Sequence, residues 1–400
     1  MGLRGKKGIQ ELEFVALMAF LMSNVALSID TVLPALPDIG LALEVSNSNH
    51  LQLIIIMIFL GLGLGELVFG TLSDSFGRRP MVYIGVGIFI LASFLIVWAP
   101  TLQMLLIGRV IQGVGLSAAR SVSISIIRDT YKGERMARIL SFIMTIFILV
   151  PMIAPLLGQL ILTAYNWEAI FYFQLLFISI TIIWFWARQE ETLSPEKRIP
   201  ISRHLFTNGL KEFFRYKNTV LFTVITGLLQ GTFIAYLGAA QQIFQGQYRM
   251  IDEFPYIFGG LALSLGLSTL LNSSLVLKYG MLKLVNFSLY LSIISSLVYI
   301  LCFSNGSNPT LTLLIVFLLI QFLASGSIPG NLSALAMQPI GHIAGIGAAI
   351  FSFISMSLGV IVAILIGKFI QDTAISLFVG FFLSGVIALV LIRYSDAKNQ

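Results

Sequence analysis

Charged residues are scarce in this chain. Only 10% of its 400 residues are Asp, Glu, Lys or Arg, whereas 57% are hydrophobic. Soluble domains carry about a quarter charged residues, so the composition excludes an ordinary soluble protein and indicates one that is solvated mainly by lipid. The net charge of +6 lies in short basic segments between apolar runs. This pattern is typical of membrane topology, and we expect no nucleic-acid partner.

Cysteine and histidine are scarcer still. The single cysteine, Cys302, excludes a disulfide within the chain, and the three histidines form no cluster with it that would indicate a metal site. No nucleophile or paired catalytic constellation appears beyond the charges inside the apolar runs. We therefore expect neither an enzyme nor a bound cofactor.

Long apolar runs fill the chain instead. A transmembrane helix needs about 20 mainly apolar residues, and twelve such runs occur. The first is too long for a signal-peptide core and lacks a small-residue cleavage site, so we expect it to be retained. The predicted spans are 14–36, 50–72, 81–99, 102–127, 138–164, 168–188, 218–244, 254–277, 281–303, 310–335, 343–367 and 373–393.

The longest polar gap divides these spans into two sets of six. The chain is thus predicted to be an all-α membrane protein with two six-helix bundles, residues 1–188 and 218–400. Residues 189–217 are interpreted as a solvated cytoplasmic linker. The turn 278–283 is a weak echo of Gly77-Arg78-Arg79, which supports two repeats with a site at their interface.

The basic residues indicate the orientation. With a cytoplasmic N-terminus, 20 of the 24 Lys and Arg residues fall on the cytoplasmic side, and only Arg249 and Lys368 lie in outer loops. Cytoplasmic loops of membrane proteins carry such an excess of basic residues. We therefore predict twelve spans with both termini cytoplasmic.

Four ionisable residues lie inside the predicted spans, and their depths match in pairs. Asp30 and Arg109 each lie about seven residues from the outer end of their span. Glu66 and Arg120 each lie about eight residues from the inner end. Each Arg therefore shares a depth of about 10–12 Å with one carboxylate. We predict an upper pair Asp30/Arg109 and a lower pair Glu66/Arg120.

Two interpretations of these charges stay open. Intramembrane ionisable residues mark proton or substrate paths, which favours a proton-coupling role for Asp30 and its neighbours. Alternatively, each pair is permanently neutralised and serves only helix packing, because breaking a buried pair is costly whatever its role. For Glu66/Arg120 the sequence favours neither reading.

Further candidates follow from helix breakers and from polar groups in the spans. Pro151, Pro155 and Gly158 in span 5 predict a hinge, since prolines remove helix hydrogen bonds. Polar and aromatic residues are candidates for an amphipathic substrate surface, although most such residues serve packing. These candidates are Gln112, Gln230, Phe233, Tyr236, Gln321 and Asn331.

Several segments resemble one transporter family. The stretch from Gly70 to Pro80 resembles the signature loop of the major facilitator superfamily between spans 2 and 3. Residues 109–115 and 151–158 resemble its span-4 motif and its antiporter motif of span 5. Residues 30–37 and 327–337 are similar to spans 1 and 10 of Bcr/CflA-type multidrug:proton antiporters. The loop residues that carry the resemblance, called here the latch residues, are Gly70, Asp74, Gly77, Arg78 and Arg79.

The resemblance implies a proton-coupled exporter of amphipathic small molecules or drugs, working by alternating access. It implies a bacterial inner membrane, protons as the coupling ion, and latch residues that hold the two bundles together at their inner ends. It also links Arg109 to proton coupling, and we expect a monomer. Two departures stand out, because Glu66 replaces a usual glutamine and Arg120 a usual small residue or proline.

Other functions stay open at this point. A dedicated exporter of one metabolite or siderophore would carry the same motifs. A non-transporting membrane sensor or assembly partner is a third possibility, against which the short outer loops argue.

Overall fold

The computed structural model describes residues 4–200 and 203–399, and the regular structure of these residues is helical. Eleven segments are long and apolar enough to cross a membrane. One of them, Leu311–Lys368, has 58 residues and contains two of the predicted spans, so the twelve spans are confirmed. The helices are α1 Arg4–Asp30, α2 Leu36–Ala42, α3 Gln52–Phe76, α4 Arg78–Val97, α5 Leu102–Thr130, α6 Gly133–Ala164, α7 Glu168–Arg188, α8 Arg203–Arg215, α9 Lys217–Gln241, α10 Phe254–Tyr279, α11 Met281–Phe303, α12 Leu311–Ser325, α13 Ile328–Met337, α14 Ala344–Lys368 and α15 Ile375–Asn399.

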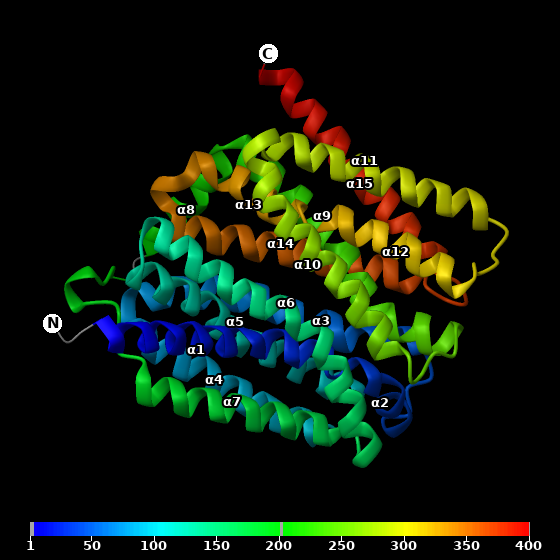
Figure 1. Ribbon diagram of the computed structural model, residues 1–400, viewed down its shortest axis with the longest axis horizontal. Coiled ribbons are helices and arrows are strands. Elements are labelled where there is room, and N and C mark those ends of the chain that lie inside the picture. The colour runs from blue at the N-terminus through cyan, green and yellow to red at the C-terminus, as the bar shows by residue number, and fades with distance from the viewer. Residues whose placement is uncertain (1–3, 201–202, 400) are drawn as a thin grey trace.

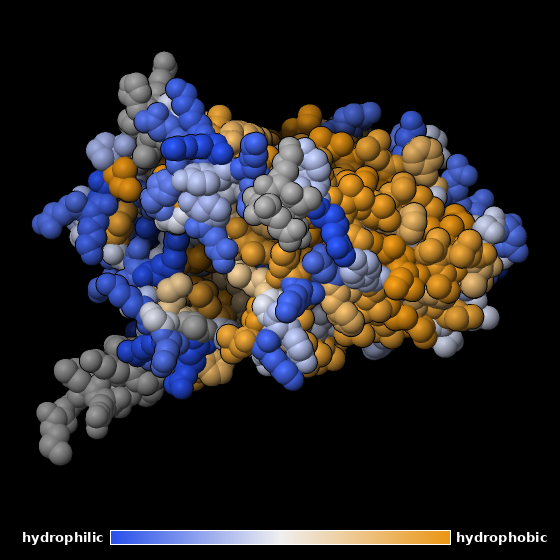
Figure 2. Space-filling model, turned by 90° about the horizontal axis from the view of Figure 1, so that it is seen from above, coloured by the Kyte–Doolittle hydropathy of each residue, from blue (hydrophilic) through white to orange (hydrophobic). Residues whose placement is uncertain are grey.

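The helices gather in two halves. Figure 1 shows α1 to α7 in one half and α9 to α15 in the other. The halves touch where α3 packs against α14 and α9, and where α6 packs against α10. Figure 2 shows an apolar surface over the middle of the molecule and hydrophilic side chains gathered at the end where the chain begins. This distribution fits a bilayer around the middle.

Two helix pairs are each joined by a glycine with a positive φ angle. Gly77 between α3 and α4 has φ of 105°, and Gly280 between α10 and α11 has φ of 82°. This backbone region favours glycine because a Cβ would clash there. The weak sequence echo of the Gly77 turn at residues 278–283 thus corresponds to a repeated turn.

Two predicted spans are broken where proline enters. The first ends as a regular helix at Asp30, and Pro34 and Pro37 begin two further short helices. Predicted span 310–335 divides into α12 and α13, with Pro329 in the first turn of α13. Proline fits the first turn of a helix but not its interior, so each proline marks a new start.

The region predicted as a solvated linker is packed on the protein at a few positions. It contains α8, whose Phe213 is fully buried, and its Leu193 is 7% exposed. Its residues also bond to the Gly77 turn, as described below. Most other described residues of the segment are exposed, so the solvated linker stays a prediction, with buried residues where Gly209 and Phe213 let α8 pack on the second half.

Candidate functional site

Two of the latch residues, Asp74 and Arg78, form a charge cluster with Asp129. The Arg79 guanidinium donates instead to the Tyr83 hydroxyl and the Trp186 carbonyl. Arg78 is 5% exposed, and its guanidinium donates to Asp74 Oδ1 at 2.5 Å and to Ser73 Oγ at 2.8 Å. Its Nε also donates to Asp129 Oδ2, at the inner end of α5, at 2.9 Å. Two carboxylates therefore compensate one buried Arg, which is the condition for a stable buried charge. The end of the molecule that holds this cluster is called the latch end below.

The linker region adds a partner that sequence reasoning missed. The carboxylate of Glu191 accepts hydrogen bonds from the backbone N–H groups of Arg78 and Arg79, each at 3.0 Å. These groups begin α4, where helix N–H groups lack partners and the dipole attracts negative charge. A Cβ on Gly77 would lie 2.7 Å from Glu191 Oε2, so glycine leaves room for this cap.

A second linker contact ties the same turn. Ile199 donates its N–H to the Asp74 carbonyl at 3.0 Å, and Ser75 Oγ donates to the Ile199 carbonyl at 2.6 Å. The linker thus crosses the latch on both sides of Gly77. No local signal around residue 191 indicates this, since its partners lie more than 110 residues earlier in the chain.

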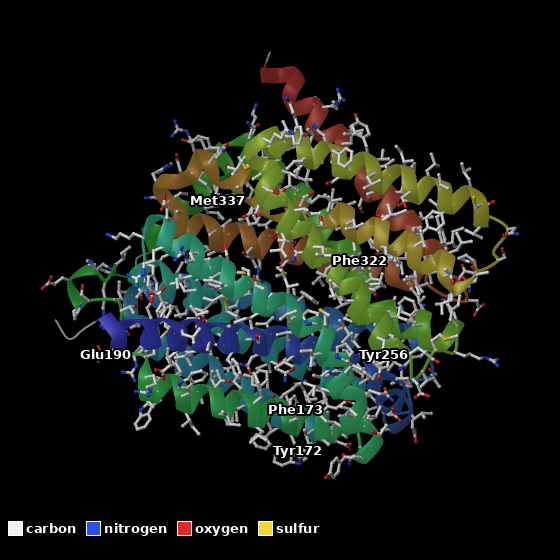
Figure 3. The ribbon with its side chains drawn as sticks, viewed as in Figure 1. Tyr172, Phe173, Glu190, Tyr256, Phe322 and Met337 are labelled. Carbon is white, nitrogen blue, oxygen red and sulfur yellow. The ribbon has the colours of Figure 1, made fainter. Side chains whose placement is uncertain are left out.

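Replacing Glu191 should loosen this turn. We expect Glu191→Ala to lower the free energy of unfolding by about 0.5–2 kcal/mol, the usual cost of losing a helix cap. The matched control is Glu190→Ala, because Glu190 is exposed at the same end of the molecule (Figure 3). Denaturant unfolding of the purified variants measures the difference. Equal effects of the two substitutions would contradict the capping role.

Arg109 does not form the predicted upper pair. It is fully buried, and it donates to the carbonyls of Ser28 and Ile54, each at 2.9 Å, and to Gln112 Oε1 at 2.7 Å. Among the described residues no ion pair includes Asp30. The prediction of a direct Asp30/Arg109 pair was therefore wrong, because backbone oxygens of α1 and α3 satisfy the guanidinium instead.

Gln112 belongs to a buried polar chain. Its Nε2 donates to Ser93 Oγ at 2.9 Å and to Gln174 Oε1 at 3.4 Å. Gln174 donates in turn to Thr31 Oγ1 at 2.9 Å, next to Asp30. These bonds link α4, α5 and α7 to the residue that follows α1. Gln112 is fully buried, and both its amide oxygen and its amide nitrogen are hydrogen-bonded within the protein.

Asp30 lies at the end of α1 facing the second half. Its side chain is 4% exposed. The Tyr236 side chain of α9 lies within electrostatic range of the carboxylate, and its hydroxyl has no hydrogen-bond partner among the residues that the structure describes. One Arg109 nitrogen, Nη2, likewise has none. Buried polar groups without partners are rare. Near Asp30, one such group from each half, Arg109 Nη2 and the Tyr236 hydroxyl, is therefore available to bind a ligand.

The lower pair is confirmed. Arg120 Nη1 lies 3.0 Å from Glu66 Oε1. The Glu66 side chain is only 8% exposed, whereas that of Arg120 is 36% exposed. The pair joins α3 to α5. The carboxylate is thus enclosed, and the guanidinium reaches an opening.

The remaining candidates divide by location. The Phe233 and Tyr236 rings stack on each other and pack against Phe322, whose ring centroid is 4.7 Å from that of Tyr236. Figure 3 shows Phe322 inside the second half. This aromatic cluster lies beside the Asp30 locus.

The other polar candidates bind neighbouring side chains. Gln230 Nε2 donates to Met356 Sδ at 3.3 Å. Gln321 is fully buried and bonds Ser292 and Ser296, and Asn331 bonds Asn272 at 2.8 Å. Gln321 and Asn331 thus face other helices of the second half rather than the Asp30 locus. A substrate role for Gln230, Gln321 or Asn331 stays a prediction.

The predicted hinge lies in a continuous helix. Helix α6 passes through both Pro151 and Pro155 without a break. A Cβ on Gly158 would lie 2.1 Å from the Thr31 carbonyl oxygen. Gly158 therefore allows α6 to approach the backbone beside Asp30, and the hinge role stays a prediction.

Polar side chains join the halves at the end opposite the latch. Gln52, at the start of α3, donates from Nε2 to Gln242 Oε1 at 2.7 Å. Gln242 donates to Asn49 Oδ1 at 3.0 Å, and Asn49 donates to the Lys368 carbonyl at 3.2 Å. These bonds close that end between the halves without any charged side chain.

Comparison with known proteins identifies the family. The model of the Major Facilitator Superfamily matches residues 15–364. The chain belongs to this superfamily. The resemblance seen in the sequence is thereby confirmed, and the protein is a membrane transporter by family.

Named relatives agree with this assignment. An uncharacterized MFS-type transporter, YdgK of Bacillus subtilis, is 27% identical and the match covers 92% of this chain and 93% of the relative. The bicyclomycin resistance protein homolog of Haemophilus influenzae is 23% identical, with 96% of each chain covered. The multidrug resistance protein MdtL of Klebsiella pneumoniae is 39% identical over 26% of this chain and 27% of its own.

The fold is shared with solved transporters. A crystal structure of a peptide transporter, POT, superposes with a TM-score of 0.75 at 14% identity, covering 97% of this chain and 94% of that one. At this identity the likeness concerns the fold alone.

Proposed function

We propose that this transporter exports amphipathic small molecules in exchange for protons, by alternating access between its two halves. The observation that carries the proposal is the Asp30 carboxylate, which is buried where the halves meet and has no ion-pair partner in the described part of the chain. An isolated buried carboxylate is costly when ionised, so it binds a proton or a cationic ligand. The names of the relatives support drugs as the exported class.

The contacts between the halves suggest what must change during transport. The Gln52–Gln242 and Asn49–Lys368 bonds close one end, and the latch cluster lies at the other. Helix α3 joins the two ends over about 36 Å. Rocking of the halves would break the uncharged bonds at one end. The bonds of the latch cluster join α3, α4, α5 and the linker region, so this cluster would move with the first half.

Proton entry supplies the energy in this scheme. One proton crossing about 100 mV supplies about 2.3 kcal/mol, and a pH unit adds about 1.4 kcal/mol. Together they sustain a substrate gradient of several hundredfold. We place the protein in a bacterial inner membrane with the latch end and both termini cytoplasmic, as the basic residues indicate.

Proton release from the purified protein tests this proposal. We expect several unrelated hydrophobic cations, added one at a time to unbuffered protein, to release protons, because substrate and proton compete at Asp30. The Asp30→Asn variant should release none. Release by one compound alone would favour an exporter dedicated to that compound, and absence of release across the panel would overturn proton exchange.

A further inference from the structure

Helix α8 carries an exposed apolar stripe that its packing does not use. Gly209 and Phe213 are buried where α8 packs on α14. On the adjacent face Phe206, Leu210 and Phe214 follow one another at intervals of four residues and are 39%, 37% and 53% exposed. Residues four apart are neighbours on a helix surface. The three side chains therefore form one continuous apolar stripe that is partly exposed.

A basic stripe lies beside the apolar one. Lys211 and Arg215 occupy the next face of α8 and are exposed. Glu212 binds Arg215 at 3.5 Å and His342 at 3.4 Å, whereas Lys211 has no ion-pair partner in the described part of the chain. An apolar face flanked by basic residues is the pattern of a helix that lies in a membrane surface. Figure 1 places α8 at the end of the molecule where the chain begins, which is the latch end.

The apolar stripe ends in a groove of about 340 Å³ between three helices. Phe214 of α8 forms one wall and Leu391 of α15 another. The third wall is one face of α9, since its lining residues lie three, four and seven positions after Lys217. These residues of α9 are Lys217, Val220, Leu221 and Val224.

Lys217 stands at the mouth of this groove. It is the first residue of α9, it is exposed, and it has no ion-pair partner among the residues that the structure describes. From Lys217 the wall runs along α9 for about 10 Å to Val224, and its other members are apolar. The groove therefore joins a cation at the membrane surface to a slot that reaches toward the bilayer interior.

We infer that the groove binds one anionic phospholipid, with its phosphate at Lys217 and an acyl chain along Val220, Leu221 and Val224. A zwitterionic lipid carries its own cation beside the phosphate, whereas unpaired lysines favour a net negative head group. A second copy of the chain does not fit this surface as well as a lipid, because it would bring like charges together at Lys211 and Lys217. The site is distinct from the Asp30 locus and does not depend on the proposed transport.

Native mass spectrometry of the full chain tests this inference. Purified protein is titrated with dioleoyl phosphatidylglycerol and, separately, with dioleoyl phosphatidylcholine. We expect tighter binding of the first lipid and an affinity lowered about fivefold by Lys217→Gln, which is the effect of one basic residue near an anionic surface. Binding of phosphatidylcholine should not change in that variant. Val224→Trp, which fills the slot, should weaken binding of both lipids.

The matched control is Lys368→Gln, which removes the same charge at the opposite end of the molecule. Its phosphatidylglycerol affinity should equal that of the unchanged protein. Equal affinities for the two lipids, or equal losses in Lys217→Gln and Lys368→Gln, would overturn the inference. Unfolding midpoints verify that the variants fold. If Val224→Trp does not fold, the lipid affinities of Lys217→Gln alone test the inference.

Discussion

Asp30→Asn should abolish proton-driven transport while leaving the fold intact. Asparagine has nearly the same volume and hydrogen-bonding shape but does not exchange a proton, and Asp30 makes no ion pair among the described residues that the change would break. Stability should therefore be unchanged or slightly higher, because the cost of a buried charge is removed.

Inside-out vesicles with an imposed pH gradient measure this effect. The transported probe is the compound that releases most protons from the purified protein. Uptake by Asp30→Asn should fall to the level of empty vesicles. The matched control is Asp38→Asn, since Asp38 is exposed on α2 only eight residues later, and its uptake should be normal. Normal uptake by Asp30→Asn would refute the proposed mechanism.

The Glu66–Arg120 pair should show strong coupling in a double-mutant cycle. Arg120→Ala leaves an enclosed carboxylate without its partner, which is costly. Glu66→Gln leaves an Arg that already reaches an opening, so it should destabilise less. The double variant Glu66→Gln/Arg120→Ala should be milder than the sum of the two, with a coupling energy of about 0.5–3 kcal/mol. Unfolding midpoints and denaturant titrations of the four proteins measure it.

Transport by the same four proteins separates the two interpretations of the pair. If the pair only fixes α3 to α5, the double variant regains the uptake that a single change removes. If Glu66 carries a proton, uptake stays lost in both proteins that lack the carboxylate, whatever their stability. Additive losses of stability would contradict the pairing itself.

The lower pair illustrates what residue spacing can predict in a membrane protein. In a helix that crosses a bilayer, position in the sequence translates directly into depth, at 1.5 Å per residue. Two charges at one depth on neighbouring helices are forced together by the cost of leaving either alone in lipid. Glu66 and Arg120 obey this rule.

The upper pair shows where that reasoning ends. Asp30 and Arg109 also share a depth, but depth leaves open the rotation of each helix and the presence of other acceptors. The Arg109 guanidinium donates to the carbonyls of Ser28 and Ile54 and not to Asp30. Arg109 can bond backbone oxygens because α1, α3 and α5 approach closely. Between α3 and α5 this approach depends on Gly61 and Gly113, where a Cβ would lie 2.0 Å and 2.2 Å from backbone oxygens of the other helix.

By itself, the sequence determined the membrane class, the twelve spans, the latch turn and the depth of each buried charge. These are properties of single segments, set by apolar length, by glycine and proline, and by the cost of charge in lipid. Only the tertiary structure decided that Arg109 binds backbone, that Glu191 caps α4, and that residues of α8, α9 and α15 line a shallow groove. Each of these depends on residues far apart in the chain, whose meeting is settled by how whole helices pack and not by any local pattern.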